Sequence, residues 1–135
     1  MMAPIQASTC CRRPASSAAT FAAASVQHHD GAGRATIFPA CNSGRWPHIH
    51  YEVYPSLADA ATASNKLATS QLALTKEASA AVYASDLYPQ STQNLSRVSL
   101  ATDNVFSDGA ELETPTITGS VADGYAIALT AAIAT

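Results

Sequence analysis

Charged residues are scarce in this chain of 135 residues. Lysine and arginine number 7, aspartate and glutamate 10, and together they supply 13% of the sequence with a formal net charge of −3. Proteins that bind nucleic acid present an excess of clustered basic side chains, which this sequence does not have. It also has no uninterrupted apolar stretch of the length that crosses a membrane as a helix. We therefore expect neither nucleic acid nor a membrane as a partner.

Aromatic residues and cysteines are also few. Aromatic residues make up 7% of the chain and alanine is abundant, so the expected core is small. The cysteines are Cys10, Cys11 and Cys41, an odd number with an adjacent pair, which is not the pattern of a disulfide framework. They have no CxxC zinc spacing either, so we expect reduced thiols. No apolar segment typical of a signal peptide is evident, which makes the cytoplasm the default compartment.

Residues 1–29 show neither the two-residue period of a strand nor the 3.6-residue period of a helix. They are rich in alanine, serine and threonine, so we expect a disordered or loosely packed N-terminal arm there. Residues 30–135 are expected to form one domain. We also hypothesise that this arm is not the ancestral first half of the domain but a replaced or truncated start.

Residues 30–135 have the patterns of a chain built mainly from strands. Alternating and β-branched residues predict strands at 45–54, 66–74, 112–121 and 125–133, with shorter ones at 35–38 and 103–109. Between the last two long strands, residues 122–124 end in glycine and predict a hairpin turn. Thr75 is a good N-cap and Glu77 suits a first helical turn, so a short helix is expected at 76–83. About five or six strands and one short helix predict an antiparallel β-sandwich or a piece of one.

Two histidines in the strand at 45–54 are the clearest candidate metal ligands. Residues at positions i and i+2 of an extended strand point to the same face. His48 and His50 therefore present two imidazoles side by side, and these can supply two nitrogen ligands to one metal ion. The plainer interpretation of such a pair alone is two solvated histidines on a half-exposed strand.

The residues that flank this pair resemble those of the intradiol ring-cleavage dioxygenases. The short-loop members of that family have the pattern Pro-Gly-x-Tyr-x-Gly-Arg-x-x-His-Ile-His. The chain matches the pattern at Pro39, Gly44, Arg45, His48, Ile49 and His50. Segments 66–74, 81–91 and 99–109 are also similar to family segments, in the same order. The resemblance covers the chain from about residue 30 to the end, and the agreement of several blocks in order makes it specific.

This resemblance implies a fold, a cofactor and a substrate. The family is built on a β-sandwich and holds a non-haem ferric ion, Fe(III), by two histidines and two tyrosinates. It opens catechol-type aromatic diols between their two hydroxyl groups with O2. His48 and His50 match the two histidine ligands, Arg45 matches the arginine that stabilises negative charge on the substrate, and Gln71 matches a glutamine of the pocket. A guanidinium three residues before a ligand is also suited, on physical grounds, to an anionic substrate.

The sequence departs from the family at both tyrosine ligands. Asn42 occupies the position of the tyrosine that precedes the first histidine by six residues, and no tyrosine precedes Tyr51. Asparagine is a neutral, weak donor that does not replace a phenolate, and two histidines alone do not select ferric iron. Two hypotheses follow. The chain is an active but divergent dioxygenase, or it is an inactive or truncated relative with a residual two-histidine site and weakly bound or absent Fe(III).

A different metal-binding fold is the third hypothesis. A cupin needs a glycine at the position of Asn42 and a glutamate at Tyr54 or Pro55, so that fold is disfavoured. Glu52 is expected on the same strand face as His50, which keeps a cluster of two histidines and one carboxylate open. If the upstream strands are missing, an exposed sheet edge favours self-association into a homo-oligomer or aggregation.

Overall fold

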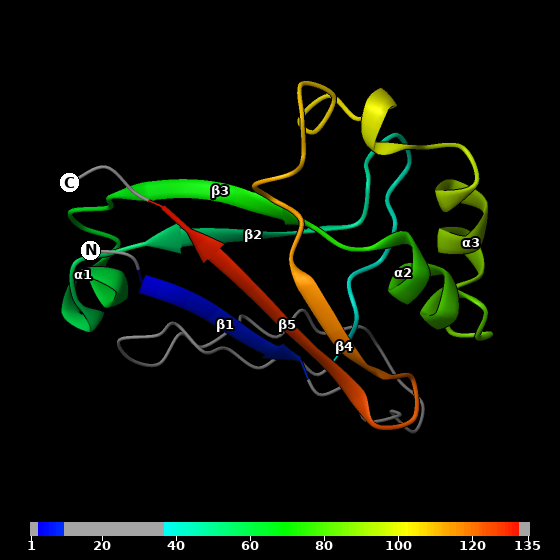
Figure 1. Ribbon diagram of the computed structural model, residues 1–135, viewed down its shortest axis with the longest axis horizontal. Coiled ribbons are helices and arrows are strands. Elements are labelled where there is room, and N and C mark those ends of the chain that lie inside the picture. Colours follow the sequence, from blue (N-terminus) through cyan, green and yellow to red (C-terminus); the bar gives the residue numbers. More distant parts are fainter. Residues whose placement is uncertain (1–2, 10–36, 133–135) are drawn as a thin grey trace.

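The computed structural model describes residues 3–9 and 37–132. The described residues form two small antiparallel sheets and a few short helices (Figure 1). In chain order the elements are β1 (Ala3–Thr9), β2 (His48–Val53), α1 (Leu57–Thr62), β3 (Ala68–Ala73), α2 (Lys76–Tyr83), α3 (Pro89–Leu95), the 3-10 turn η1 (Leu100–Thr102), β4 (Thr116–Ser120) and β5 (Gly124–Ala131). One sheet has the strand order β1-β5-β4, and the other pairs β2 with β3. No helix of the described residues has the length and apolar character needed to cross a membrane.

The predicted mainly β character is confirmed in this coarse form. One short helix was predicted, but the described residues form three α-helices. Helix α2 has the predicted bounds, and the side chain of Thr75 accepts a hydrogen bond from the Ala78 amide at 3.4 Å. Two further helices start at signals of the same kind. Ser56 caps α1 by accepting from the amide of Asp59, and Pro89 lies in the first turn of α3, where its missing N–H costs nothing.

The first strand corrects part of the expected N-terminal arm. Ala3–Thr9 forms β1, which pairs antiparallel with β5 in a register that runs from Ala3 opposite Ala131 to Thr9 opposite Tyr125. Ladder pairing with β5 satisfies backbone groups whatever the local side-chain pattern, so a segment without periodicity forms a strand here. The rest of that arm, residues 1–2 and 10–29, lies outside the described residues. Of the short strand expected at 35–38, residues 35–36 also lie outside them, and residues 37–38 do not form a strand.

The C-terminal hairpin is confirmed, although its first strand begins at Thr116 and not at residue 112, and the strand expected at 103–109 is wrong. Strands β4 and β5 pair from Thr116 opposite Ala128 to Ser120 opposite Gly124. Residues 103–109 form turns instead, because the carboxylate of Asp103 accepts hydrogen bonds from the amides of Val105 and Phe106. Those bonds bend the backbone locally and compete with strand pairing.

One apolar cluster contacts both sheets and positions the histidine strand. Its buried members from the strands are Leu72 of β3 and Tyr125, Ile127 and Leu129 of β5, and Ile49 and Tyr51 of β2 pack against it. Helix α2 contributes buried residues to the same cluster. Because alternate residues of a strand face opposite sides, seating Ile49 and Tyr51 in this core turns His48 and His50 outward.

Candidate functional site

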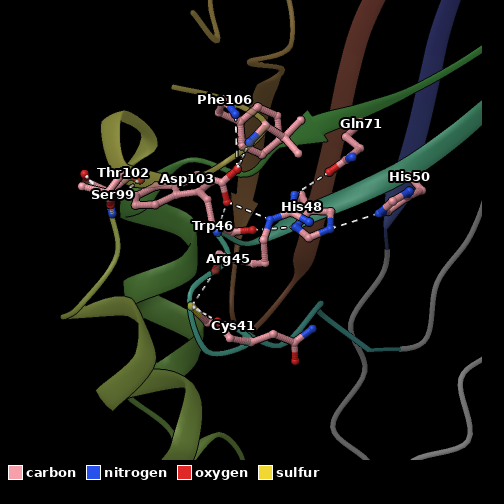
Figure 2. Close-up of polar contacts among 12 residues, drawn as sticks. Cys41, Arg45, Trp46, His48, His50, Gln71, Ser99, Thr102, Asp103 and Phe106 are labelled. Atoms are coloured by element: carbon pink, nitrogen blue, oxygen red, sulfur yellow. Dashed lines mark hydrogen bonds and ion pairs between the residues drawn. The ribbon is translucent and has the colours of Figure 1, made fainter. Parts of the chain in front are cut away.

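The two predicted ligands converge on one point. His48 and His50 lie on the outward face of β2, with ring centroids 5.0 Å apart. Their Nε2 atoms are 3.1 Å apart, and Figure 2 shows the two rings extending toward one another. Two imidazole nitrogens bound to one ion at about 2.1 Å and at right angles lie about 3.0 Å apart. The observed separation therefore suits a pair of adjacent ligands on a single metal ion.

A hydrogen bond fixes the orientation of the His48 ring. Its Nδ1 lies 2.6 Å from the carbonyl oxygen of Trp46, which can only accept, so Nδ1 carries the proton. The neutral ring then has its lone pair on Nε2, and His50 donates to it from Nε2–H. Metal-binding histidines commonly donate their second ring nitrogen to a carbonyl in this way. The ring of Phe106 meets His48 edge-on, with centroids 6.3 Å apart.

The charge state of His48 suits a ligand. Burial lowers its pKa below the ordinary value of 6.5, and the positive charges of Arg45 and His50 act in the same direction. The hydrogen bond to Trp46 and the negative charge of Asp103 oppose this shift without reversing it. His48 is therefore neutral at pH 7, which leaves a lone pair for a metal rather than a bound proton.

All four predicted site residues lie together. Gln71 of β3 is the direct cross-strand partner of His50, so the two side chains share a face. Arg45 reaches the same place from the loop before β2, and its Nη2 donates to Oε1 of Gln71 at 2.7 Å (Figure 2). The site thus combines two imidazoles, a guanidinium and an amide, contributed by β2, β3 and the loop between residues 38 and 47.

That loop is held by helix α3. The amide of Cys41 donates to Oγ of Ser91 at 3.0 Å, and Nδ2 of Asn94 donates to the Cys41 carbonyl at 2.8 Å. In the turn that follows, the Arg45 amide donates to the Asn42 carbonyl at 3.2 Å and Gly44 has a φ of +76°. The bonds that hold Cys41 before the turn, and the bond that closes the turn, fix the position from which the Arg45 side chain extends.

Asp103 is the residue of the site that the sequence did not reveal. Its side chain is 0% exposed, and its Oδ2 accepts from Nε of Arg45 at 3.0 Å and from the Trp46 amide at 2.6 Å. Its Oδ1 accepts from the amides of Val105 at 2.8 Å and Phe106 at 3.2 Å. An aspartate can predict local bonds to the backbone that follows it, but not the contacts with Arg45 and Trp46.

The donors present do not make up the ferric cage of the family that the sequence resembles. Within residues 3–9 and 37–132, no three histidine, cysteine, aspartate or glutamate side chains are grouped to hold a metal ion. The cluster of two histidines and a carboxylate is therefore not formed. Glu52 instead accepts from Lys66 at 2.8 Å and from the Tyr54 hydroxyl at 2.5 Å.

The tyrosines are engaged elsewhere. All five lie in the described part of the chain. Tyr51 packs against the core, Tyr54 contacts Glu52, Tyr83 and Tyr88 donate to the carbonyls of Pro39 and Phe38, and Tyr125 is buried against Phe38. Asn42, at the position of a family tyrosine, is exposed in its turn. The described residues thus bring together the two predicted histidines and place no phenolate beside them.

Comparisons of the chain with models of protein families, with curated proteins and with solved structures found no match.

Proposed function

We propose that this chain is an intradiol dioxygenase-like protein. Its His48 and His50 bind a non-haem iron ion, and a catechol-type aromatic diol binds beside Arg45 and Gln71. The observation that supports this most directly is the 3.1 Å convergence of the two Nε2 atoms beside the 2.7 Å contact between Arg45 and Gln71. The sequence resemblance predicted the same four residues as one site.

The arrangement of the strands also supports the proposal. The intradiol fold is a β-sandwich, and here two antiparallel sheets contribute to one apolar cluster. We infer that the β1-β5-β4 sheet and the β2-β3 sheet are two layers of such a sandwich, with α2 and α3 covering one end of the core (Figure 1). The histidine pair then lies on the outer face of the smaller layer.

The residues of the chain have distinct tasks in this proposal. Arg45 is 26% exposed, so its guanidinium has N–H groups available for the negatively charged oxygens of a diol while Asp103 holds its Nε. Gln71 limits the positions open to the guanidinium by accepting from Nη2. Bound iron in this family activates the ring for attack by O2. Fixed positive charge beside the diol stabilises its deprotonated form and the charge that develops during attack.

A second candidate function is a relative that binds metal without cleaving rings. The exposed Asn42 and the engagement of every tyrosine elsewhere favour it. Without anionic oxygen ligands, ferric iron loses much of its advantage over divalent ions at this site. In this version the two imidazoles, Arg45 and Gln71 still bind a metal and an aromatic diol.

Iron loading followed by oxygen measurement separates these functions. The chain is purified from iron-supplemented cells and assayed for bound iron, for tyrosinate-to-iron absorption, and for O2 uptake and diacid formation with catechol. His50→Ala is the test variant because His50 is exposed, and Glu52→Gln is the matched control on the same strand face. Uptake that is lost in His50→Ala and kept in Glu52→Gln supports the enzyme. Metal binding with the same dependence but without uptake supports the second candidate, and no metal binding overturns both.

A further inference from the structure

The buried carboxylate of Asp103 connects the guanidinium of Arg45 with the backbone that orients His48. Asp103 lies in the turn after η1. It is 58 residues along the chain from Arg45 and 57 from Trp46. Its Oδ2 accepts from both of these neighbours, while Oδ1 accepts from the amides of its own turn. One oxygen therefore bonds to the local turn, and the other bonds to Arg45 and Trp46 in the loop before β2.

The Trp46 backbone transmits this anchoring to His48. Its amide donates to Asp103 at 2.6 Å and its carbonyl accepts from Nδ1 of His48 at 2.6 Å. The indole is also fixed, because Nε1 donates to the Leu74 carbonyl at 2.7 Å. With the amide and the side chain both held, the carbonyl has one direction available, and that direction determines the tautomer and the rotation of the His48 ring.

Arg45 is fixed through the same oxygen. Its Nε donates to Oδ2 of Asp103 at 3.0 Å, which leaves Nη2 for Gln71 and the remaining N–H groups for a ligand. A charge-assisted bond to a fully buried carboxylate is geometrically more restrictive than a bond to a mobile surface group. Figure 2 shows Asp103 between Arg45, Trp46 and Phe106, on the side of His48 away from His50.

We propose that Asp103 is a positioning residue. It holds the Nε2 lone pair of His48 and the guanidinium of Arg45 in a fixed relative orientation, so that a metal ion at His48 and an anionic diol at Arg45 bind side by side. In this role Asp103 contacts neither the metal ion nor the diol. The metal and the diol follow from the proposed function, but the orientation of His48 and Arg45 is a property of the chain alone. The two parts are therefore tested separately.

Asp103→Asn is the test variant because it keeps the size of the side chain and the Oδ1 acceptor for Val105 and Phe106. When the amide oxygen stays on Val105 and Phe106, the amide nitrogen faces the two donors of Arg45 and Trp46, and the bonds that are lost are those to Arg45 and Trp46. Ile127→Val, a small change in the buried core of β5, is the control for a general loss of stability.

The first measurement uses the metal-free protein and imidazole nitrogen NMR at pH 8. We expect the wild type and Ile127→Val to hold His48 as the Nδ1–H tautomer, and Asp103→Asn to shift it toward a mixture. In the wild type we also expect the Nε–H signal of Arg45 to exchange slowly with water. A wild-type mixture of tautomers, free exchange at Arg45, or an unchanged His48 in the variant overturns the proposal. The wild-type signals decide even if the variant does not fold.

The second measurement titrates Ni²⁺ into the same proteins. Loss of the group that orients a metal-binding histidine typically costs 10–100-fold in affinity, and we expect a decrease of about that size in Asp103→Asn and none in Ile127→Val. Equal affinity in all three proteins overturns the role of Asp103. Absence of Ni²⁺ binding in the wild type counts against the proposed function, while the tautomer measurement still decides the orientation of His48.

Discussion

The ionisation of Asp103 is set by competition between burial and hydrogen bonding. Burial raises its pKa, but the bonds from Trp46, Val105, Arg45 and Phe106 favour the charged form, and the net result is a pKa below the ordinary value of 3.8. The folded chain therefore binds a proton at Asp103 less readily than the unfolded chain does. A depressed aspartate pKa of this kind links the stability of the fold to pH.

We predict that acid unfolding of this protein depends on Asp103. Its stabilising contribution is fully present above the ordinary aspartate pKa of 3.8 and is lost as the pH falls through the lower pKa of the folded state. At pH 7, Asp103→Asn is expected to lower the free energy of unfolding by about 2–4 kcal/mol, because two donors lose a charged acceptor. Urea unfolding between pH 7 and pH 3 measures both effects. Equal pH dependence in the wild type and the variant would contradict the prediction.

The proposed ligands His48 and His50 lead to a prediction about metal preference. Two imidazole ligands without an anionic oxygen follow the general order of affinity for divalent ions, so Cu²⁺ is expected to bind more tightly than Ni²⁺ or Zn²⁺. Fe(III) is expected to be lost on dialysis against citrate. Calorimetric titration with each divalent ion and elemental analysis after dialysis measure this. Stoichiometric iron that survives citrate, with a red colour, would show that a phenolate ligand is present after all.

Sequence patterns located the two histidines but not the contacts that hold the surrounding residues in place. The two-residue period of a strand is local, so HIH was sufficient to place His48 and His50 on one face. The contact between Arg45 and Gln71 was predictable only through the family pattern, because strand register across β2 and β3 is not written in either strand alone. Asp103 depends on tertiary packing across more than 50 residues of chain, for which a single sequence carries no signal.

Among the elements, the clearest local constraint is in the hairpin of β4 and β5. Gly119 has a φ of +107°, and a Cβ placed on it would lie 2.1 Å from the carbonyl oxygen of Gly124. The strain cannot be relieved by moving a flexible side chain, because the neighbouring atom belongs to the backbone of the paired strand. This position therefore requires glycine both for its dihedral angle and for space.

We predict that Gly119→Ala destabilises the hairpin far more than a similar change elsewhere. Gly44→Ala is the matched control, because Gly44 has a φ of +76° but nothing within 4 Å of a new Cβ. The control is expected to cost about 1 kcal/mol from backbone strain alone, and Gly119→Ala about 3 kcal/mol or more. Urea unfolding followed by circular dichroism compares them. Similar losses in both variants would show that the hairpin opens to accommodate the methyl group.

The elements themselves were predictable where a local signal was strong. Thr75 and Glu77 gave the bounds of α2, and the glycine at 124 gave the hairpin turn. Helix α1 was underestimated because its alanine-rich sequence buries nothing, and the cap at Ser56 rather than an apolar stripe starts it. The segment 103–109 looked like a strand because Val105 and Phe106 are strand formers, yet the Asp103 side chain bends it into turns.

At the scale of the whole molecule, the two sheets depend on one apolar cluster, so they are expected to unfold together. Trp46 is the single tryptophan of the chain, is 5% exposed, and lies beside the histidine strand. Ile127 is 1% exposed and belongs to β5 of the other sheet. Trp46 fluorescence therefore reports on one sheet after a change made in the other.

We predict that Ile127→Ala shifts the Trp46 transition and the circular dichroism transition by the same amount. The loss in the free energy of unfolding is expected to be about 2–4 kcal/mol, because the cavity lies in the shared core. Thr118→Ala, at an exposed position of β4, is the control and is expected to leave both transitions nearly unchanged. Urea unfolding with both probes makes the comparison. If Ile127→Ala moves only the circular dichroism transition, the sheets unfold independently, and the histidine strand does not depend on the C-terminal hairpin for its stability.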